Sequence, residues 1–314
     1  MEVIRDISDF RFDKNSAVTV GTFDGVHLGH RRIIDKLNGV RSSKNLRSII
    51  ITFEPHPQIV LKNRGKDIKI LSTLEEKLSI FRECNVDITY VINFTREFSQ
   101  TSASEFYINY LIKKIGLCDL ILGYDHMFGK NREGNFDTLR ELSHKYEFSI
   151  DKVEEYKPEG EHVSSSAVRH LLEKGEVAKA AGLLGRDYSL SGTVTKGRQL
   201  GRELGYPTAN IKPDNEFKLI PGKGVYAVTS RIKGNEYSGM MSIGQNPTVT
   251  DDESIKLEVN LFDFSGDIYG EKITVNFMEY LRSEVKFDSI EELKDQMSRD
   301  KLSSGEIFAK LKSI

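Results

Sequence analysis

The chain has 314 residues with a formal net charge of −2, 38% hydrophobic and 29% charged residues, and no tryptophan. Its 45 basic and 47 acidic residues nearly balance, which argues against binding to polynucleotides or anionic membranes through general electrostatics. The length favours two domains of ordinary size. No apolar run reaches the roughly 18 residues of a membrane span, and the acidic N-terminus lacks the pattern of a signal peptide.

The two cysteines, Cys84 and Cys118, form no CxxC pair. This spacing excludes a disulfide framework and a cysteine-rich zinc site. A reducing compartment is the simplest setting for such a chain, and we therefore expect a cytoplasmic protein.

Residues 1–185 alternate between short apolar runs and amphipathic stretches. We expect strands over Ala17–Val20, Ser48–Phe53, Asp87–Ile92, Asp119–Leu122 and Phe148–Val153. We expect helices over His30–Val40, from a capping box at Ser72 and Glu75 to about Cys84, and from a capping box at Ser102 and Glu105 to about Ile115. Strands that alternate with helices predict an α/β domain with a Rossmann-like parallel sheet.

After Gly185 the pattern changes to short strands separated by Gly, Pro and Asn. We expect strands over Gly192–Lys196, Gly224–Ile232, Glu236–Ile243, Lys256–Phe264 and Lys272–Tyr280. Such a series predicts a small, mainly antiparallel six-stranded β-barrel, which two helices would follow, over Asp288–Asp300 and Ser304–Ile314. We therefore divide the chain into domains 1–185 and 186–314.

The strongest local motif is GTFDGVHLGH, which leaves the first strand and enters the first helix. This junction of a parallel sheet presents backbone N–H groups to phosphate. Gly21 and Gly25 permit a tight turn there, and Gly29 lets a phosphate approach the backbone. His27 and His30 share one face of the helix start. Two imidazoles in that place can donate hydrogen bonds to a transferring phosphate and to its pyrophosphate leaving group.

A second motif, SSSAVR, begins a helix late in the same half of the chain. The hydroxyls of Ser164, Ser165 and Ser166 and the free N–H groups of the helix suit a triphosphate, and Arg169 supplies positive charge. Serines alone are more simply explained as a helix cap. Together, however, the two motifs resemble the HxGH nucleotidyltransferase superfamily, whose members transfer an adenylyl or cytidylyl group.

Two further segments, TFEPHP after the second strand and LGYDHMFG after the fourth, narrow the resemblance. The first half resembles the adenylyltransferase module of the bacterial bifunctional riboflavin kinase/FAD synthetases, except at His126-Met127. The resemblance implies that His27, His30 and Arg169 are catalytic. It also implies an ATP and FMN site formed by Gly21, Thr22, Phe23, Asp24, Gly25, Gly29, Phe53, His56, Gly123, Asp125, Ser164, Ser165 and Ser166. Phe53 and Phe128 could line the flavin or adenine ring, but for either residue alone core packing is the commoner explanation.

The second half carries independent motifs, GTVTKGR and GRELGYPTAN. The first gives a glycine-punctuated strand end suited to phosphates. Thr208 and Asn210 offer the neutral oxygens that Mg²⁺ accepts together with phosphates and water. A surface loop with Pro and Asn as turn formers is the alternative.

The PTAN run resembles the riboflavin kinase motif, and KLEVNLFDF resembles the glutamate-bearing strand of that family. The resemblance implies that Glu258 is the general base for the riboflavin 5′-hydroxyl, although alternation alone would make it a solvated residue beside Lys256 and Asn260. It also implies an ATP and riboflavin site formed by Gly192, Val194, Lys196, Gly197, Gly205, Pro207, Thr208, Asn210 and Arg282.

The resemblance of both halves implies a two-module enzyme that phosphorylates riboflavin to FMN and then adenylylates FMN to FAD, with ATP and Mg²⁺ in both steps. A second possibility is that only one activity works. A third is a ligand- or nucleic-acid-binding barrel, which usually needs basic residues interleaved with aromatics, whereas this half has many acids. We expect small-molecule partners, with neither nucleic acid nor membrane, and leave open whether the chain is a monomer or a homo-oligomer.

Overall fold

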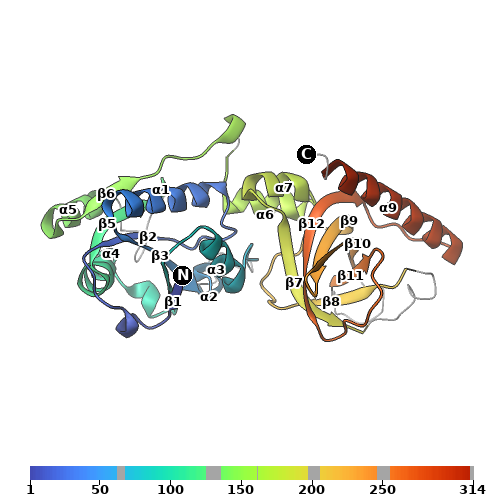
Figure 1. The fold of residues 1–314 in the computed structure, drawn as a ribbon, viewed down its shortest axis with the longest axis horizontal. Coiled ribbons are helices and arrows are strands. Elements are labelled where there is room, and N and C mark those ends of the chain that lie inside the picture. The colour runs from blue at the N-terminus through green and yellow to red at the C-terminus, as the bar shows by residue number, and fades with distance from the viewer. Residues whose placement is uncertain (62–67, 125–135, 161, 197–205, 246–254, 312–314) are drawn as a thin grey trace. The chain divides into compact units, whose positions relative to one another are not determined.

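The computed structural model describes all residues except 62–67, 125–135, 161, 197–205, 246–254 and 312–314. The chain forms two compact units, Met1–Ser165 and Ser166–Ile314 (Figure 1). The sequence pattern changes later, near Gly185, so the domain ranges 1–185 and 186–314 stay a prediction. Across the described residues, the structure contains no helix with the length and apolarity needed to cross a bilayer.

The first unit is built on a parallel sheet with the strand order β1-β4-β3-β2-β5-β6. All five predicted strands are present, and their ends differ from the prediction by at most two residues. The additional strand, β1, is only three residues long. The strands are β1 (Glu2–Ile4), β2 (Ser16–Val20), β3 (Arg47–Glu54), β4 (Ile88–Asn93), β5 (Leu117–Leu122) and β6 (Ser149–Lys152).

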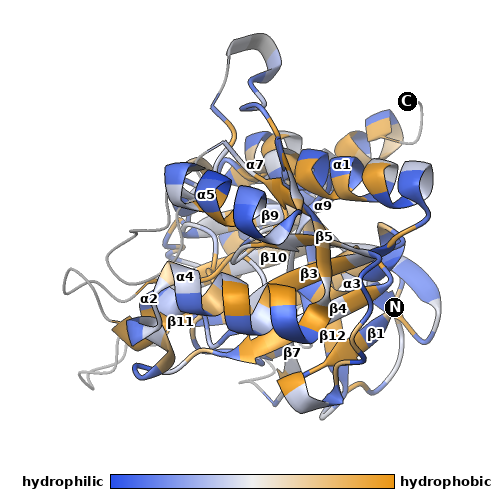
Figure 2. Ribbon diagram, turned by 90° about the vertical axis from the view of Figure 1, so that its left-hand side faces the viewer, coloured by the Kyte–Doolittle hydropathy of each residue, from blue (hydrophilic) through white to orange (hydrophobic). Residues whose placement is uncertain are grey.

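Alternate residues of β3 point into two different cores, because successive strand side chains face opposite sides of a sheet. Ile49 and Ile51 join a cluster with α4 (Ala103–Phe106), the π-helix η3 (Tyr107–Ile115) and α5 (Phe136–Tyr146). Ile50 joins a second cluster with α1 (Leu28–Lys44) and α3 (Leu74–Glu83). Figure 2 shows hydrophobic residues concentrated on β3 and β4, while α5 is largely hydrophilic. The sheet is therefore covered on both faces.

The predicted capping boxes fare differently. Ser102 and Glu105 form the predicted box at the start of α4, and the helical stretch continues to Ile115 as a π-helix. The box at α3, however, is formed by Thr73 and Glu76, so the expected pair Ser72 and Glu75 is wrong by one residue. Ser72 is buried, and its backbone N–H donates to Asp24 Oδ1 instead. Short helices complete the first unit at α2 (Pro57–Leu61), η1 (Ile7–Asp9), η2 (Phe98–Gln100) and η5 (Pro158–Gly160).

The second unit is a closed barrel with the strand order β10-β11-β8-β7-β12-β9, and all of its pairings are antiparallel. The predicted six-stranded barrel is thus confirmed, with five strands predicted directly. The sixth, β8, was not predicted as a strand, because it holds the Ala-Asn end of the PTAN run. The strands are β7 (Tyr188–Thr195), β8 (Ala209–Pro213), β9 (Gly224–Ile232), β10 (Asn235–Gln245), β11 (Ile255–Leu261) and β12 (Lys272–Arg282).

Helices precede and follow the barrel. Helix α6 (Ser165–Glu173) and helix α7 (Val177–Leu184) lead into β7, and α7 contacts β7 and β12. At the C-terminal end, one helix, α9 (Ile290–Leu311), replaces the two predicted helices. Asp300, Ser304 and Phe308 lie four residues apart along α9 and are all buried. This continuous buried face explains why the helix runs through residues 301–303, where a break was expected.

Candidate active sites

The GTFDGVHLGH loop leaves β2 at the centre of the parallel sheet. There the strand order reverses, because β3 lies on one side of β2 and β5 on the other. Open α/β sheets bind ligands outside the carboxyl ends of their strands at this switch point. The loops after β3 and β5 hold His56 and Gly123, so three predicted site segments leave neighbouring strands at the same edge.

The two histidines of the motif pack against each other at the start of α1. Their rings are stacked with centroids 3.7 Å apart and planes inclined by 17°. His27 is the N-cap of the helix, and its Nδ1 accepts a hydrogen bond from the backbone N–H of His30 at 3.3 Å. The edge of Phe23 packs on the His30 ring, with centroids 5.2 Å apart. Capping and stacking therefore fix the orientation of both imidazoles.

Two glycines of the motif lie where a side chain would be strained or crowded. Gly25 has a φ of 81°, which glycine adopts readily. A Cβ at Gly29 would lie 3.2 Å from the His27 ring atoms Cε1 and Nδ1. Phe23 and Val26 also have positive φ values, 49° and 39°, which are rare for bulky residues and indicate a tightly constrained loop. The loop geometry therefore leaves little room for substitution beside His27.

Asp24 and Ser165 have structural partners within the first unit. The Asp24 carboxylate accepts from the backbone N–H groups of Leu71 at 2.9 Å and Ser72 at 3.1 Å. The Ser165 hydroxyl donates to the Asp24 carbonyl at 2.9 Å. The SSSAVR motif is thus brought to the GTFDG loop at its first helical residue. A ligand role for either residue stays a prediction.

The remaining predicted residues of the first site differ in their surroundings. Phe53 is buried in the core and packs edge-on against Phe94, and its role at the ligand site stays a prediction. His56 is 8% exposed, and its Nδ1 accepts from the Gln58 backbone N–H at 3.2 Å. Gly21 and Thr22 directly follow β2. Ser164 lies in the loop before α6.

Several expected residues are not placed at this site by the structure. Asp125, Phe128 and the divergent pair His126-Met127 lie outside the described residues. Ser166 and Arg169 lie on α6, in the second unit. Their roles in adenylyl transfer therefore stay predictions.

Sequence reasoning missed Lys77, a buried lysine on α3 that is only 3% exposed. Its Nζ lies within hydrogen-bonding distance of the Thr22 carbonyl at 3.3 Å, the Thr52 hydroxyl at 3.2 Å and the Phe53 carbonyl at 3.4 Å. Burial lowers the pKa of the Lys77 ammonium, against the opposite effect of the Glu54 and Asp24 carboxylates. A lysine within a helical sequence carries no signal that it points inward.

In the barrel, Glu258 of β11 pairs directly with Asn210 of β8, and Asn210 pairs with Thr195 of β7. The Thr195 hydroxyl also approaches the Asn210 carbonyl at 3.5 Å. The Glu258 carboxylate forms an ion pair with Lys256 Nζ at 2.8 Å, and both side chains are about a third exposed or less. Two predicted kinase residues, Glu258 and Asn210, are therefore cross-strand neighbours.

The PTAN segment is held in place by its neighbours on two sides. The buried Asn260 donates from Nδ2 to the Pro207 carbonyl at 2.7 Å. The hydroxyls of Tyr206 and Ser298 lie 2.8 Å apart, which ties the segment to α9. Thr208 is partly exposed in the short stretch before β8. The segment is thus fixed immediately before the two predicted metal ligands.

The other predicted phosphate-loop residues have mixed surroundings. A Cβ at Gly192 would lie 2.5 Å from Ile211 Cγ2 and 2.5 Å from the Lys212 carbonyl, so this glycine permits the close approach of β7 and β8. Val194 is buried. Lys196 is exposed, with its Nζ 5.9 Å from the centre of the Tyr269 ring. Gly197 and Gly205 lie outside the described residues.

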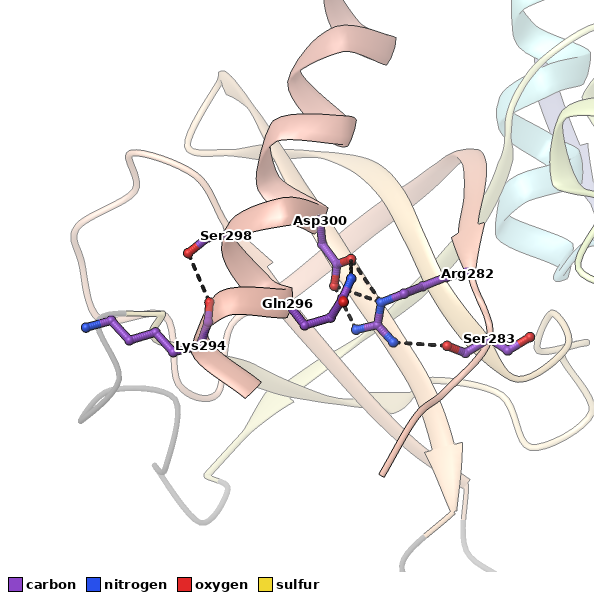
Figure 3. Close-up of polar contacts among 6 residues, drawn as sticks. All are labelled: Arg282, Ser283, Lys294, Gln296, Ser298 and Asp300. Atoms are coloured by element: carbon purple, nitrogen blue, oxygen red, sulfur yellow. Dashed lines mark hydrogen bonds and ion pairs between the residues drawn. The ribbon is translucent and has the colours of Figure 1, made fainter. Parts of the chain in front are cut away.

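Arg282, at the end of β12, fastens the C-terminal helix to the barrel (Figure 3). Its guanidinium binds the buried Asp300 carboxylate through Nε at 2.9 Å and Nη2 at 2.7 Å. Gln296 Nε2 donates to the same carboxylate at 2.8 Å, and Arg282 Nη1 donates to the Ser283 carbonyl at 3.0 Å. Arg282 is therefore engaged by α9, and its contact with a ligand stays a prediction.

The fold and these sites define a transferase with two modules: a nucleotidyltransferase-like parallel sheet and a kinase-like antiparallel barrel. Family models agree, with FAD synthetase matching residues 9–167 and riboflavin kinase matching residues 184–308. Curated relatives named bifunctional riboflavin kinase/FMN adenylyltransferase are 38% identical in Listeria monocytogenes, over 95% of this chain and 94% of that protein, and 36% identical in Escherichia coli K12, over 98% of both.

A solved structure from Streptococcus pneumoniae, described as a macrolide-efflux protein, is 30% identical, with a TM-score of 0.87 over 96% of this chain and 97% of that one. It shares the fold along nearly its whole length, although its description names a different activity. The chain belongs to the family of bifunctional riboflavin kinase/FMN adenylyltransferases. The resemblance found in the sequence motifs is thereby confirmed.

Proposed function

We propose that the two activities of this enzyme are carried out at the two sites described above. The barrel transfers the γ-phosphoryl group of ATP to the riboflavin 5′-hydroxyl, giving FMN and ADP. The parallel-sheet module transfers AMP from a second ATP to FMN, giving FAD and pyrophosphate. The observation that carries this division is that the two family models match separate stretches of the chain, residues 9–167 and residues 184–308.

In the barrel, Glu258 accepts the proton of the riboflavin hydroxyl. A carboxylate suits this step, because phosphoryl transfer otherwise depends mostly on positioning and charge stabilisation. The ion pair with Lys256 orients the Glu258 carboxylate on the strand face that it shares with Asn260. Asn210 lies directly across from it on β8.

The same pair of strands fits Mg²⁺. Thr208 and Asn210 offer neutral oxygens, and Asn210 lies opposite Glu258 in the strand pairing. Mg²⁺ prefers such hard donors together with phosphate oxygens and water. Thr208 and Asn210 would hold the ion, which would offset the charge of the triphosphate. The strand register supports this assignment, because it places Glu258 directly opposite Asn210.

In the parallel-sheet module, the phosphate of FMN attacks the α-phosphorus of ATP, and the bond to pyrophosphate breaks. No covalent enzyme intermediate is needed, because the attacking phosphate is already anionic. His27 and His30 donate hydrogen bonds to the charge that develops on the transferring group. Their stacked, capped arrangement orients them before substrate binds. Arg169 and the SSSAVR hydroxyls bind the triphosphate.

A flavin assay separates this proposal from an enzyme with one working activity. Purified protein is incubated with riboflavin, ATP and Mg²⁺, and separately with FMN, ATP and Mg²⁺, and the products are resolved by chromatography. We expect FMN and FAD from the first mixture and FAD from the second. FMN alone would mean that the module containing His126-Met127 does not adenylylate FMN. No product from folded protein would refute the substrate assignment.

The proposed surroundings follow from the same chemistry. The substrates are small molecules, and we propose a cytoplasmic enzyme without nucleic-acid or membrane partners. Net charge near neutrality and two cysteines that form no disulfide support this. Retention on immobilised polynucleotide at low salt tests the absence of a nucleic-acid partner, because strong retention would contradict it.

A further inference from the structure

The buried ammonium of Lys77 connects two loops of the proposed adenylyltransferase site. Its three acceptors are the Thr22 carbonyl, the Thr52 hydroxyl and the Phe53 carbonyl. An ammonium has three N–H donors, so these contacts can use all of them. Thr22 lies two residues after the end of β2, and Phe53 lies near the end of β3. One side chain therefore joins the carboxyl ends of two neighbouring strands.

These two strand ends lead into the segments that carry the predicted histidines. Thr22 begins the loop to His27, and Phe53 is three residues before His56. The Thr52 hydroxyl donates to the Thr22 carbonyl at 3.1 Å, which adds a second link between the same loops. Thr52 is fully buried. Lys77, Thr52 and the Thr22 carbonyl are therefore mutually hydrogen-bonded. The two side chains are buried, so substrate does not reach them.

The histidine loop also contacts the segment just before α3. Asp24, in the histidine loop, accepts from the backbone N–H groups of Leu71 and Ser72, just before α3. Lys77 extends from α3 back to the histidine loop. The loop and the helix therefore hold each other through one carboxylate and one ammonium. Burial lowers the pKa of that ammonium, and the Glu54 and Asp24 carboxylates oppose the lowering. Burial of a charge is costly unless it is paired and hydrogen-bonded.

We propose that Lys77 is a positioning residue for adenylyl transfer, which holds the loop after β2 and the loop after β3 in the relative placement that the reaction needs. This inference rests on the proposed function of the parallel-sheet module. Lys77 touches no substrate, because it is 3% exposed and is directed at backbone carbonyls. Its effect on the reaction runs through the placement of His27, His30 and His56.

The test compares Lys77→Met, which removes the ammonium and keeps much of the side-chain volume, with the parent protein. The control is Lys113→Met, the same substitution at an exposed lysine of η3. Steady-state kcat and KM are measured for FAD formation from FMN, and FMN formation from riboflavin in the same samples monitors the barrel. We expect kcat for FAD formation to fall by about tenfold or more, because small misplacements of reacting groups have effects of this size.

The accompanying parameters separate positioning from a merely structural role. Positioning predicts a fall in kcat with KM for FMN and ATP within about twofold, a cooperative thermal transition and unchanged FMN formation. Partial unfolding would instead lower the active fraction, which hydrogen exchange of β2 and β3 measures independently. A loss of activity equal to the unfolded fraction would overturn the inference, as would a folded Lys77→Met protein with the parent's kcat.

If Lys77→Met does not fold, a milder pair decides the question. Thr52→Val removes one hydroxyl of the network and preserves the side-chain shape, and Thr52→Ser restores the hydroxyl. We expect Thr52→Val to lower kcat for FAD formation several-fold and Thr52→Ser to recover most of it. Equal kcat for both would overturn the inference. His30→Ala, measured in parallel, tests the proposed function itself, because FAD formation that survives it refutes the site and not Lys77 alone.

Discussion

Glu258 and Asn210 face each other as a direct antiparallel pair on β11 and β8. The carboxylate proposed to accept the hydroxyl proton thus lies beside the amide proposed to bind the metal ion. Lys256 completes the arrangement, with Nζ 2.8 Å from Glu258 Oε1. The barrel register, which closes the sheet by hydrogen bonding, therefore also assembles the proposed kinase site.

Glu258→Gln should abolish FMN formation while FMN is still converted to FAD. The amide keeps the size and hydrogen-bonding capacity of the side chain but cannot accept the hydroxyl proton at neutral pH, and general base catalysis typically contributes about 10²–10⁴-fold. Chromatography of flavins after incubation with riboflavin and ATP, or with FMN and ATP, measures both steps in one preparation. FMN formation at the parent rate would exclude Glu258 as the base.

His27 has two roles that substitution separates. Asn is a preferred helix N-cap, whereas Ala leaves the first turn uncapped at a cost of about 1 kcal/mol. We therefore expect His27→Ala to lower the stability of the first unit and His27→Asn to leave it nearly unchanged. Both should lose FAD formation, because both lack the imidazole. Thermal unfolding and the flavin assay test this together, and active His27→Asn would reduce the role of His27 to capping.

The sequence alone predicted those features that depend on local pattern. Strand periodicity located β2 to β6 and most of the barrel, and the glycine-histidine spacing located the loop at the switch point. The errors arose where tertiary contacts decide. Both Ser72 and Thr73 have a glutamate three residues on, and burial of Ser72 against Asp24 selects Thr73 as the cap.

The proposed sites show the same division. Motif spacing indicated Glu258 and Asn210 separately, but their pairing follows from strand register, which no local pattern specifies. Lys77 could not be found in this way, because its inward orientation depends on acceptors in two distant loops. The sequence motifs suggested a ligand-binding role for Arg282. Its contacts with Asp300 depend on the packing of α9 against β12, which no local pattern specifies.

Asp300→Asn should loosen α9 from the barrel. The substitution removes the charge that Arg282 binds through two nitrogens and leaves that guanidinium partly buried. Hydrogen bonds to charged groups contribute about 1.5–3 kcal/mol, so we expect a loss of this order. Hydrogen exchange in Ile290–Leu311 should accelerate, and the exposed Asp295→Asn is the matched control. Unchanged exchange in α9 would show that Phe308 and its neighbours suffice to hold the helix.

Cys118 should react slowly with thiol reagents near pH 8. Burial raises the pKa of its thiol, and a hydrogen bond with Asp119 and the charge of that carboxylate raise it further. The thiolate is the reactive form, so folded protein should react more slowly than urea-unfolded protein, and its rate should keep rising at higher pH. The thiol of the unfolded chain loses its proton at lower pH than the thiol of the folded protein. The ionisation of Cys118 therefore lowers the stability of the fold as pH rises from the unfolded-state pKa to the folded-state pKa.

The measurement for Cys118 is the rate of modification by a chromogenic disulfide as a function of pH. Cys84→Ser isolates the signal. Adding Asp119→Asn should lower the pH at which Cys118 begins to react, since the carboxylate opposes formation of the thiolate. A folded-state profile that matches the unfolded one would contradict the assigned environment.

Gly192→Ala should destabilise the barrel and impair FMN formation without affecting conversion of FMN to FAD. The added Cβ would meet Ile211 Cγ2 and the Lys212 carbonyl at 2.5 Å, so β8 must move, and overpacking of this kind typically costs about 1–3 kcal/mol. The displacement would carry Asn210, next to Ile211 on β8, away from its place opposite Glu258.

Gly39→Ala is the control, because that exposed glycine of α1 has no heavy atom within 4 Å of an added Cβ. It should stabilise the protein by about 0.5–1 kcal/mol, since alanine favours a helix. Urea unfolding and the flavin assay measure both effects, and a stable, active Gly192→Ala protein would mean that β7 and β8 separate at little cost.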